Sequence, residues 1–394
     1  MKIFHTADWH LGKLVQGVYM TEDQRYILEQ FIEAIKSEQP DVVIIAGDLY
    51  DRAVPPTEAV NLLNEVLEKI VLDLEIPVVA VAGNHDSPGR LHFGSSILKK
   101  NGLHIVGQYT KDTLPVKLTD DAGDVYFHLV PYADPSMIRH AFDDETIQNH
   151  HDAMRKIVEN IENNFSMDNR HVFVGHAFVT PFGEQEENTS DSERPLSIGG
   201  AEHVDARLFT NFNYTALGHL HQAHYVMQEN IQYAGSPLKY SISEENHKKG
   251  YLIVELDTEG HTHVEKRLLS PKRDMLTVET TINDLLQHET DEDYVFVRLL
   301  DETPVLSPME KVRSVYPNAM HVERKVQISS SGNVLEKHNI ERHKMDDFSL
   351  FKAFYKEVKG SEVTEDTSNL FKQVLDELLL EDDRVQTTKQ TTSK

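Results

Sequence analysis

The sequence contains no cysteine among its 394 residues. This absence excludes disulfides, zinc–thiolate fingers, iron–sulfur clusters and cysteine nucleophiles. Histidine, in contrast, occurs 22 times, far more often than packing requires in a chain of this length. Metal binding and catalysis must therefore use groups other than thiols, and histidine stands out among them.

Positive charge is scarce: 39 Lys and Arg stand against 65 Asp and Glu, so the formal net charge is −26. Such a field repels nucleic acid and anionic lipid at long range, and any polyanion must be held locally. The chain also lacks an apolar run of 18 residues, and Asp8 lies where a signal peptide needs its apolar region. We therefore expect a cytoplasmic protein without membrane contact. No G-x-x-x-x-G-K loop indicates ATP hydrolysis by this chain.

Hydrophobic patterning predicts an α/β fold for the first part of the chain. Short β-branched runs alternate with amphipathic helical patterns, which is typical of strands buried between helix layers. We expect strands at 2–6, 42–46, 77–82, 171–175 and 214–218.

Two helices are predicted between the first three of these strands. The helix over 21–38 begins with a capping box formed by Thr21 and Gln24. A second helix starts at Pro55-Pro56-Thr57, and its apolar stripe runs through Val60, Leu63, Leu67, Ile70 and Leu74.

The pattern changes beyond about residue 272. Half-exposed strands are expected at 275–280, 294–300 and 319–325, with helices at 282–287 and 308–316 between them. We therefore expect a large α/β domain at 1–272, a small α+β domain at 273–345, a helical segment at 346–381 and a disordered tail at 382–394.

The helical segment carries large apolar side chains at spacings of three and four. They are Phe348, Phe351, Phe354, Tyr355, Leu370, Phe371, Val374, Leu375 and Leu378. Two amphipathic helices without strands cannot bury both faces alone. They either bind a partner or dock on the rest of the chain.

Five predicted strands are each followed by a loop that carries Asp, Asn or His. The loops contain Asp8-x-His10, Gly47-Asp48-x-x-Asp51, Gly83-Asn84-His85-Asp86, Gly175-His176 and Gly218-His219-x-His221. In layered α/β folds, reactive groups gather in loops at one end of the sheet. We therefore expect these side chains to meet at one rim.

The rim offers more ligands than one metal ion needs. An ion uses about three or four protein side chains, and the candidate ligands here are Asp8, His10, Asp48, Asn84, His176, His219 and His221. This set fits two ions that share Asp48, and its imidazole and oxygen donors suit Mn²⁺, Fe²⁺ or Zn²⁺ better than Mg²⁺. Ions about 3.5–4 Å apart activate water and clamp the attacking and leaving oxygens of a displacement at phosphorus. We expect His85 to contact the phosphate or protonate the leaving oxygen.

These motifs resemble the calcineurin-like metallophosphoesterase superfamily. Two further stretches, 191–202 and 234–241, resemble the bacterial SbcD family of nuclease subunits, and the similarity extends to about residue 330. The resemblance implies a two-sheet sandwich flanked by helices, a small α+β capping domain and C-terminal helices. It implies that one metal is held by Asp8, His10, Asp48 and His221, and the other by Asp48, Asn84, His176 and His219.

The same resemblance assigns roles around the metals. It implies that His85 is catalytic. Archaeal and eukaryotic relatives tend to have histidine at the position of Asp51, whereas bacterial relatives resemble this sequence. We expect Asp51 to lie in the metal shell or to hydrogen-bond there, and Asp86 to support the site as well.

The implied function is that of a two-metal DNA nuclease in repair, recombination and replication. The resemblance implies a 3′→5′ exonuclease on double strands and an endonuclease on single strands and hairpins, with two divalent ions that we expect to be Mn²⁺. It implies an SbcC-type ATPase as partner in a heterotetramer, contacted by the C-terminal helices, and a homodimer through the nuclease domain.

The sequence alone leaves two other functional hypotheses open. A stand-alone small-molecule phosphodiesterase or phosphatase could use the same metal site, and the charge of −26 favours it because DNA-binding domains are usually basic. A non-enzymatic scaffold could retain the fold. The complete ligand set argues against the scaffold, and the extra domain and helices argue against the small-molecule enzyme.

Overall fold

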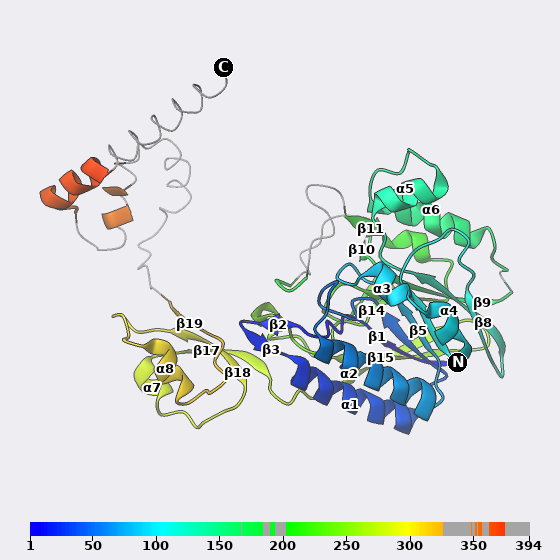
Figure 1. The fold of residues 1–394 in the computed structure, drawn as a ribbon, viewed down its shortest axis with the longest axis horizontal. Helices are drawn as coiled ribbons and strands as arrows, with labels where there is room; N and C mark the ends of the chain where they lie inside the picture. The colour runs from blue at the N-terminus through cyan, green and yellow to red at the C-terminus, as the bar shows by residue number, and fades with distance from the viewer. Residues whose placement is uncertain are drawn as a thin grey trace, which may run out of the picture. The chain divides into compact units, whose positions relative to one another are not determined.

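The computed structural model describes residues 1–166, 168–183, 190–193, 202–325, 348, 351–352, 354–356 and 362–374 (Figure 1). The chain divides into two compact units, Met1–Val326 and Gln327–Lys394. In the described part of the chain no helix is long and apolar enough to cross a membrane.

Two six-stranded sheets form the body of the first unit. The first has the order β16-β15-β1-β4-β5-β6, from β1 (Lys2–Thr6), β4 (Val42–Ala46), β5 (Val78–Val81), β6 (Leu103–Val106), β15 (Gly250–Leu256) and β16 (Thr262–Leu268). The second has the order β13-β14-β12-β9-β8-β7, from β7 (Val116–Asp120), β8 (Gly123–Val130), β9 (Arg170–His176), β12 (Tyr214–Gly218), β13 (His224–Val226) and β14 (Gln228–Tyr233). The short strands are β2 (Leu14–Val15), β3 (Val18–Tyr19), β10 (Phe178–Thr180) and β11 (His203–Asp205).

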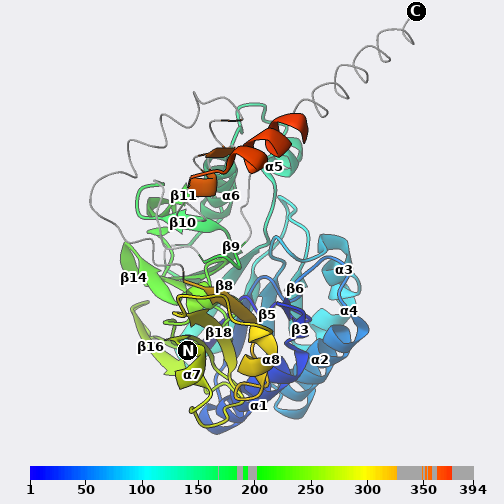
Figure 2. The same ribbon diagram turned by 90° about the vertical axis from the view of Figure 1, so that its left-hand side faces the viewer.

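Helices cover the outer faces of the sandwich. On the first sheet lie α1 (Thr21–Glu38) and α2 (Thr57–Glu68), and α2 continues as a π turn over Lys69–Asp73. The second sheet is covered by α5 (Pro135–Phe142) and α6 (His150–Glu162), while α3 (Pro88–His92) and α4 (Ser95–Leu98) precede β6 (Figure 2). The expected two-sheet sandwich flanked by helices is confirmed.

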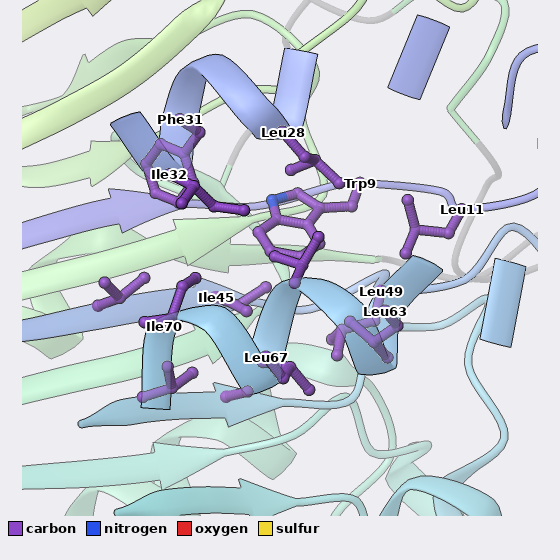
Figure 3. Close-up of a cluster of buried hydrophobic side chains, with 14 of the residues drawn as sticks. Trp9, Leu11, Leu28, Phe31, Ile32, Ile45, Leu49, Leu63, Leu67 and Ile70 are labelled. Carbon is purple, nitrogen blue, oxygen red and sulfur yellow. The ribbon is translucent and has the colours of Figure 1, made fainter. Parts of the chain in front are cut away.

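The central strands are buried on both faces, which explains their continuous apolar sequences. On β4, Val43 and Ile45 face the helices, whereas Val42, Ile44 and Ala46 face the other sheet. Figure 3 shows Trp9 between side chains of α1 (Leu28, Phe31) and α2 (Leu63, Leu67). Trp9 lies three residues after the end of β1, between Asp8 and His10, so this core anchors the loop that carries them.

The predicted capping box of α1 is wrong. The residue that caps the helix is Met20, and no side-chain hydrogen bond caps it. Gln24 is buried, and its carboxamide accepts from Gly12 N (3.0 Å) and donates to the carbonyls of Trp9 (3.1 Å) and His10 (2.8 Å). Gln24 thus fixes the first site loop, a tertiary role that overrides local capping. In α2, Val60 is exposed, and Leu62 and Val66 are buried instead.

The α+β elements lie where the sequence predicts them. Parallel strands β17 (Met275–Thr280), β18 (Tyr294–Leu299) and β19 (His321–Arg324) pack with α7 (Ile282–Leu285) and α8 (Pro308–Arg313) around their own core. Buried Asp23 of α1 links them to the sandwich, because its carboxylate accepts from Arg273 Nη1 (3.0 Å) and Tyr294 Oη (2.7 Å).

In the second unit, residues 365–374 are helical. The rings of Phe351 and Phe371 stack with their centroids 3.9 Å apart, and Phe348 lies 6.2 Å from Phe371. Leu375, Leu378 and the tail expected at 382–394 lie outside the described residues.

Candidate metal centre

The five loops meet because the strands before them run in the same direction. In the first sheet β1, β4 and β5 are parallel, and in the second sheet β9 and β12 are parallel. Backbone hydrogen bonds tie the first two loops together, from Asp8 N to Gly47 O (3.0 Å) and from His10 N to Asp48 O (2.9 Å). The carboxyl ends of both sheets thus contribute side chains to one site.

One group of donor atoms comes from Asp8, His10 and His221. Their ligand atoms lie within 4.8 Å of one another, and all three residues are buried. His10 Nε2 and His221 Nε2 approach to 3.1 Å. These three residues come from the first and last of the five loops and could hold one ion.

A second group is formed by Asp8, Asp48 and His176. His176 Nε2 lies 2.9 Å from Asn84 Oδ1 and 3.5 Å from Asp48 Oδ2. The same Asp48 oxygen lies 3.5 Å from His10 Nε2. A single carboxylate oxygen therefore stands between the two groups of histidines.

His219 contacts the site through its backbone N–H and the edge of its ring. Its backbone N–H donates to both carboxylate oxygens of Asp8 (3.0 and 3.1 Å), and its ring meets that of His176 edge-on at 5.4 Å between centroids. Among the described residues, its ring nitrogens are not part of the groups whose donor atoms lie within 4.8 Å. The structure brings His219 beside the second group, next to His176.

The electrostatics of the donor set suit a divalent cation. Burial and the neighbouring Asp48 raise the pKa of Asp8 well above its usual range. Burial also opposes ionisation of Asp48, but His176 and His10 outweigh it and lower the pKa of Asp48 to about 2. Burial lowers the pKa of His10 to about 4, so this imidazole is neutral at pH 7. Neutral imidazoles around buried carboxylates leave negative charge that a bound cation would neutralise.

The backbone at the site adopts conformations that L-residues rarely occupy. Asp8 (φ 54°), His10 (φ 45°), Asp48 (φ 50°) and His219 (φ 111°) all have positive φ. Such conformations cost about 1–3 kcal/mol each and cluster at functional sites. Gly47 also has positive φ (93°), and a Cβ there would lie 2.2 Å from His176 Nδ1, so the close approach of the two loops requires glycine.

His85 lies at the edge of both groups. Its backbone N–H donates to Asp48 Oδ1 (2.8 Å), and its Nδ1 donates to the carbonyl of Asp51 (2.8 Å). Its ring lies 4.7 Å from that of His10. With Nδ1 bound to a carbonyl, Nε2 is the nitrogen available to a substrate.

The two supporting aspartates act on different parts of the site. Asp51 Oδ1 lies 2.8 Å from Lys13 Nζ and 3.5 Å from His10 Nδ1. Asp86 accepts hydrogen bonds from the backbone N–H groups of Leu49, Tyr50 and Gly83 (2.9–3.1 Å). Asp86 therefore ties the loop after β4 to the loop after β5.

Sequence reasoning missed a buried network behind His221. Glu244 Oε1 lies 3.1 Å from His221 Nδ1, and Glu244 Oε2 accepts from Lys249 Nζ (2.5 Å). Burial opposes ionisation of Glu244, but Lys249 and the hydrogen bond from His221 outweigh it and hold its pKa well below the usual range. Glu193 Oε1 accepts from His221 N (2.7 Å). Glu193 stands in one of the stretches that carry the resemblance, whereas Glu244 and Lys249 carry no sequence signal.

The chain matches two family models and a curated relative. The calcineurin-like phosphoesterase family matches residues 1–223, and the type 5 capsule protein repressor C-terminal domain matches residues 271–359. A curated relative from Staphylococcus saprophyticus, described as the D subunit of the nuclease SbcCD, is 36% identical over 386 residues, which are 97% of this chain and 99% of the relative. The chain belongs to the SbcD family. Members of this family are metal-dependent phosphodiesterases of the calcineurin-like fold, and so is this chain.

Two solved structures match this chain at low similarity. A Thermus thermophilus protein matches with 12% identity over 67% of this chain and 98% of its own, with a TM-score of 0.37. A dimetal phosphatase from Danio rerio matches with 11% identity over 68% of this chain and 96% of its own, with a TM-score of 0.40.

Proposed function

We propose that this SbcD-family chain is a cytoplasmic DNA nuclease subunit that hydrolyses phosphodiesters at two divalent ions. The observation that carries the proposal is the position of Asp48 Oδ2, 3.5 Å from both His10 Nε2 and His176 Nε2. In the proposal Asp8, His10, Asp48 and His221 hold one ion, and Asp48, Asn84, His176 and His219 hold the other. The mixed imidazole and oxygen donors favour Mn²⁺.

The metal ions and the side chains of this chain would have different roles in the hydrolysis. When bound, the ions supply activation of water and stabilisation of negative charge at phosphorus. When both of its ring nitrogens carry a proton, His85 would face the scissile phosphate and give the Nε2 proton to the leaving oxygen, while the Asp51 carbonyl accepts from its Nδ1–H. The hydrogen bonds of Asp86, and the bond from His85 N to Asp48 Oδ1, hold the loop after β4 against the loop after β5. They therefore fix the position of His85 relative to Asp48.

Family membership further supports a substrate and partners. We propose 3′→5′ exonuclease activity on duplex DNA, endonuclease activity on single strands and hairpins, and assembly with an SbcC-type ATPase as a heterotetramer. We also propose a homodimer through the nuclease domain, supported by the exposed side chains of Phe93 (86% exposed) and Ile97 near α3 and α4. The proposed divisions are 1–272 for the nuclease domain, 273–345 for the cap, 346–381 for partner binding and 382–394 for a tail.

The test is digestion of linear duplex DNA with Mn²⁺, with and without the ATPase partner. We expect the chain with its partner to degrade the duplex from its 3′ ends, and chelation by EDTA to stop it. The charge of −26 favours the rival enzyme, a small-molecule phosphodiesterase or phosphatase. Rapid hydrolysis of bis-p-nitrophenyl phosphate combined with no DNA cleavage under either condition would decide for the rival.

The C-terminal residues assigned to the partner fall into two sets in the structure. Phe351 and Phe371 stack on each other, whereas Phe354 (61% exposed) and Leu370 (63% exposed) expose their side chains, as does Val374. We propose that the exposed set contacts the ATPase, since the rings of the stacked pair already cover part of each other and are only half-exposed.

Charged substitutions in the exposed set should separate partner binding from catalysis. We expect Phe354→Asp together with Leu370→Asp to abolish co-purification with the ATPase, because both would place a charge in an apolar interface. Manganese-dependent hydrolysis of bis-p-nitrophenyl phosphate should stay within about twofold of wild type. Val60→Asp, at an exposed valine on α2, is the matched control and should bind the partner normally. Intact complex formation by the double variant, with a lowered melting temperature, would instead assign these residues to the chain's own core.

A further inference from the structure

In His10, His176 and His221, one ring nitrogen belongs to a donor group and the other points away from it. These site histidines differ in the hydrogen-bond partner of this second nitrogen. His176 Nδ1 donates to the carbonyl of Ala46 (3.0 Å), and His10 Nδ1 lies 3.5 Å from the nearest Asp51 oxygen, beyond a good hydrogen bond. His221 Nδ1 lies 3.1 Å from Glu244 Oε1. Within the described residues, His221 is thus the site histidine that a fully buried carboxylate binds directly.

The surroundings of His221 Nδ1 determine where its proton lies. Ser192 Oγ is 2.8 Å from Nδ1, and the Ser192 hydroxyl donates to Glu244 Oε1. Both neighbours of Nδ1 therefore act as acceptors, so Nδ1 must carry the hydrogen. The neutral ring then has its lone pair on Nε2, the nitrogen that faces His10 and the donor group containing Asp8.

Lys249 completes the arrangement. Its ammonium has three N–H groups and three oxygen acceptors: Glu244 Oε2 (2.5 Å), the carbonyl of His221 (2.8 Å) and Ser236 Oγ (2.8 Å). Ser236 donates its own hydrogen to Leu238 O, so its oxygen is free to accept. Lys249 thus neutralises Glu244 and also holds the backbone of His221, whose N–H is held by Glu193.

We propose that Glu244 and Lys249 are positioning residues that hold His221 in the tautomer with a free Nε2 and orient it toward a metal ion. The proposal rests on the two-metal function proposed above and adds residues that the ligand motifs do not contain. A carboxylate behind a ligating histidine fixes its tautomer and ring orientation and raises its basicity. Lys249 lowers the free-energy cost of burying such a carboxylate, because a buried charge without a partner of opposite sign would destabilise the fold.

The decisive variant is Glu244→Gln. Lys249 retains the carboxamide oxygen as its acceptor, so the amide NH₂ turns toward His221 Nδ1 and favours the opposite tautomer, with hydrogen on Nε2. We expect ¹⁵N-histidine NMR of the metal-free chain to show His221 protonated at Nδ1 in wild type and at Nε2 in the variant, with the signal assigned by its loss in His221→Gln. Calorimetric titration with Mn²⁺ alone should show one of two sites weakened by about 10- to 100-fold.

The matched control is Glu245→Gln, the same substitution one residue along. The Glu245 carboxylate accepts from Thr277 N (2.9 Å) at the cap and does not contact His221, so its titration should equal wild type. A double variant, Glu244→Gln with Lys249→Met, frees the amide oxygen to accept from His221. We expect it to recover the Nδ1–H tautomer and at least part of the lost affinity, and it replaces the single variant if that does not fold.

The outcomes separate this inference from the proposed function. Wild type that binds no Mn²⁺ would overturn the function itself. Two Mn²⁺ sites of wild-type affinity in Glu244→Gln, or His221 protonated at Nε2 in wild type, would overturn only the positioning role. A folded double variant that keeps the Nε2–H tautomer and binds more weakly than the single variant would mark the pair as merely structural.

Discussion

We expect Asp48→Ala to abolish phosphodiester hydrolysis and to remove both metal ions. Asp48 Oδ2 stands between the two histidine groups, so its loss removes a ligand from each ion. Metal ions supply several kcal/mol of transition-state stabilisation, and each 1.36 kcal/mol is tenfold in rate, so the loss should be at least ~1000-fold. Elemental analysis measures the metal content, circular dichroism checks the fold, and hydrolysis of bis-p-nitrophenyl phosphate measures the activity.

The backbone at Asp48 requires a second variant. Alanine is strained at φ 50°, whereas asparagine tolerates this conformation and can still accept from His85 N, so Asp48→Asn isolates the loss of charge. Asp143→Ala and Asp143→Asn are matched controls, because Asp143 has φ 51° and lies exposed at the end of α5. Two ions per chain in both Asp48 variants would show that Asp48 does not bridge.

A second large effect is expected for His85→Gln. The variant should retain both ions and bind DNA, but its turnover should fall by about 10²- to 10⁴-fold, the usual contribution of a general acid. The reason is that His85 contacts the loops through its backbone and the Asp51 carbonyl and leaves Nε2 for the substrate. Single-turnover kinetics measure the loss of turnover, and metal analysis measures the bound ions. The control is His92→Gln, at an exposed histidine.

Geometry also defines what would contradict this assignment. His10, Asp51 and His85 have donor atoms within 4.8 Å of one another. If His85→Gln loses an ion, His85 is itself a ligand, and the assignment of Asn84 has to be reconsidered.

The sequence predicted the site loops well because each follows a short apolar strand. On β4 every residue is buried, so the strand was visible as an uninterrupted run, and Asp48 two residues later marked its carboxyl end. Parallel pairing then places such ends at one edge. The gathering of Asp8, His10, Asp48 and His176 required only this rule, and the structure brings them together.

Contacts that depend on tertiary packing escaped prediction. Gln24 looked like half of a capping box, but its carboxamide is used by Gly12 and two loop carbonyls, which only the folded chain places within reach. Glu244 and Lys249 were not singled out, because nothing in a local pattern reveals that both are buried against His221. Ligand positions follow from strand ends, whereas their supporting partners follow from packing between distant segments.

The pairing of β1 with β15 has a consequence for synthesis of the chain. Lys2 is paired with Glu255, and the candidate ligands extend from Asp8 to His221, so the site needs the chain up to His221 and the pairing of β1 needs it up to β15. At about 5–20 residues per second, a ribosome needs roughly 12–50 s to make the residues between these strands. During that interval one edge of β1 has no partner, which exposes the nascent chain to aggregation. We therefore expect the candidate site to hold metal ions only once the chain has been made beyond His221, so shorter nascent chains should be inactive.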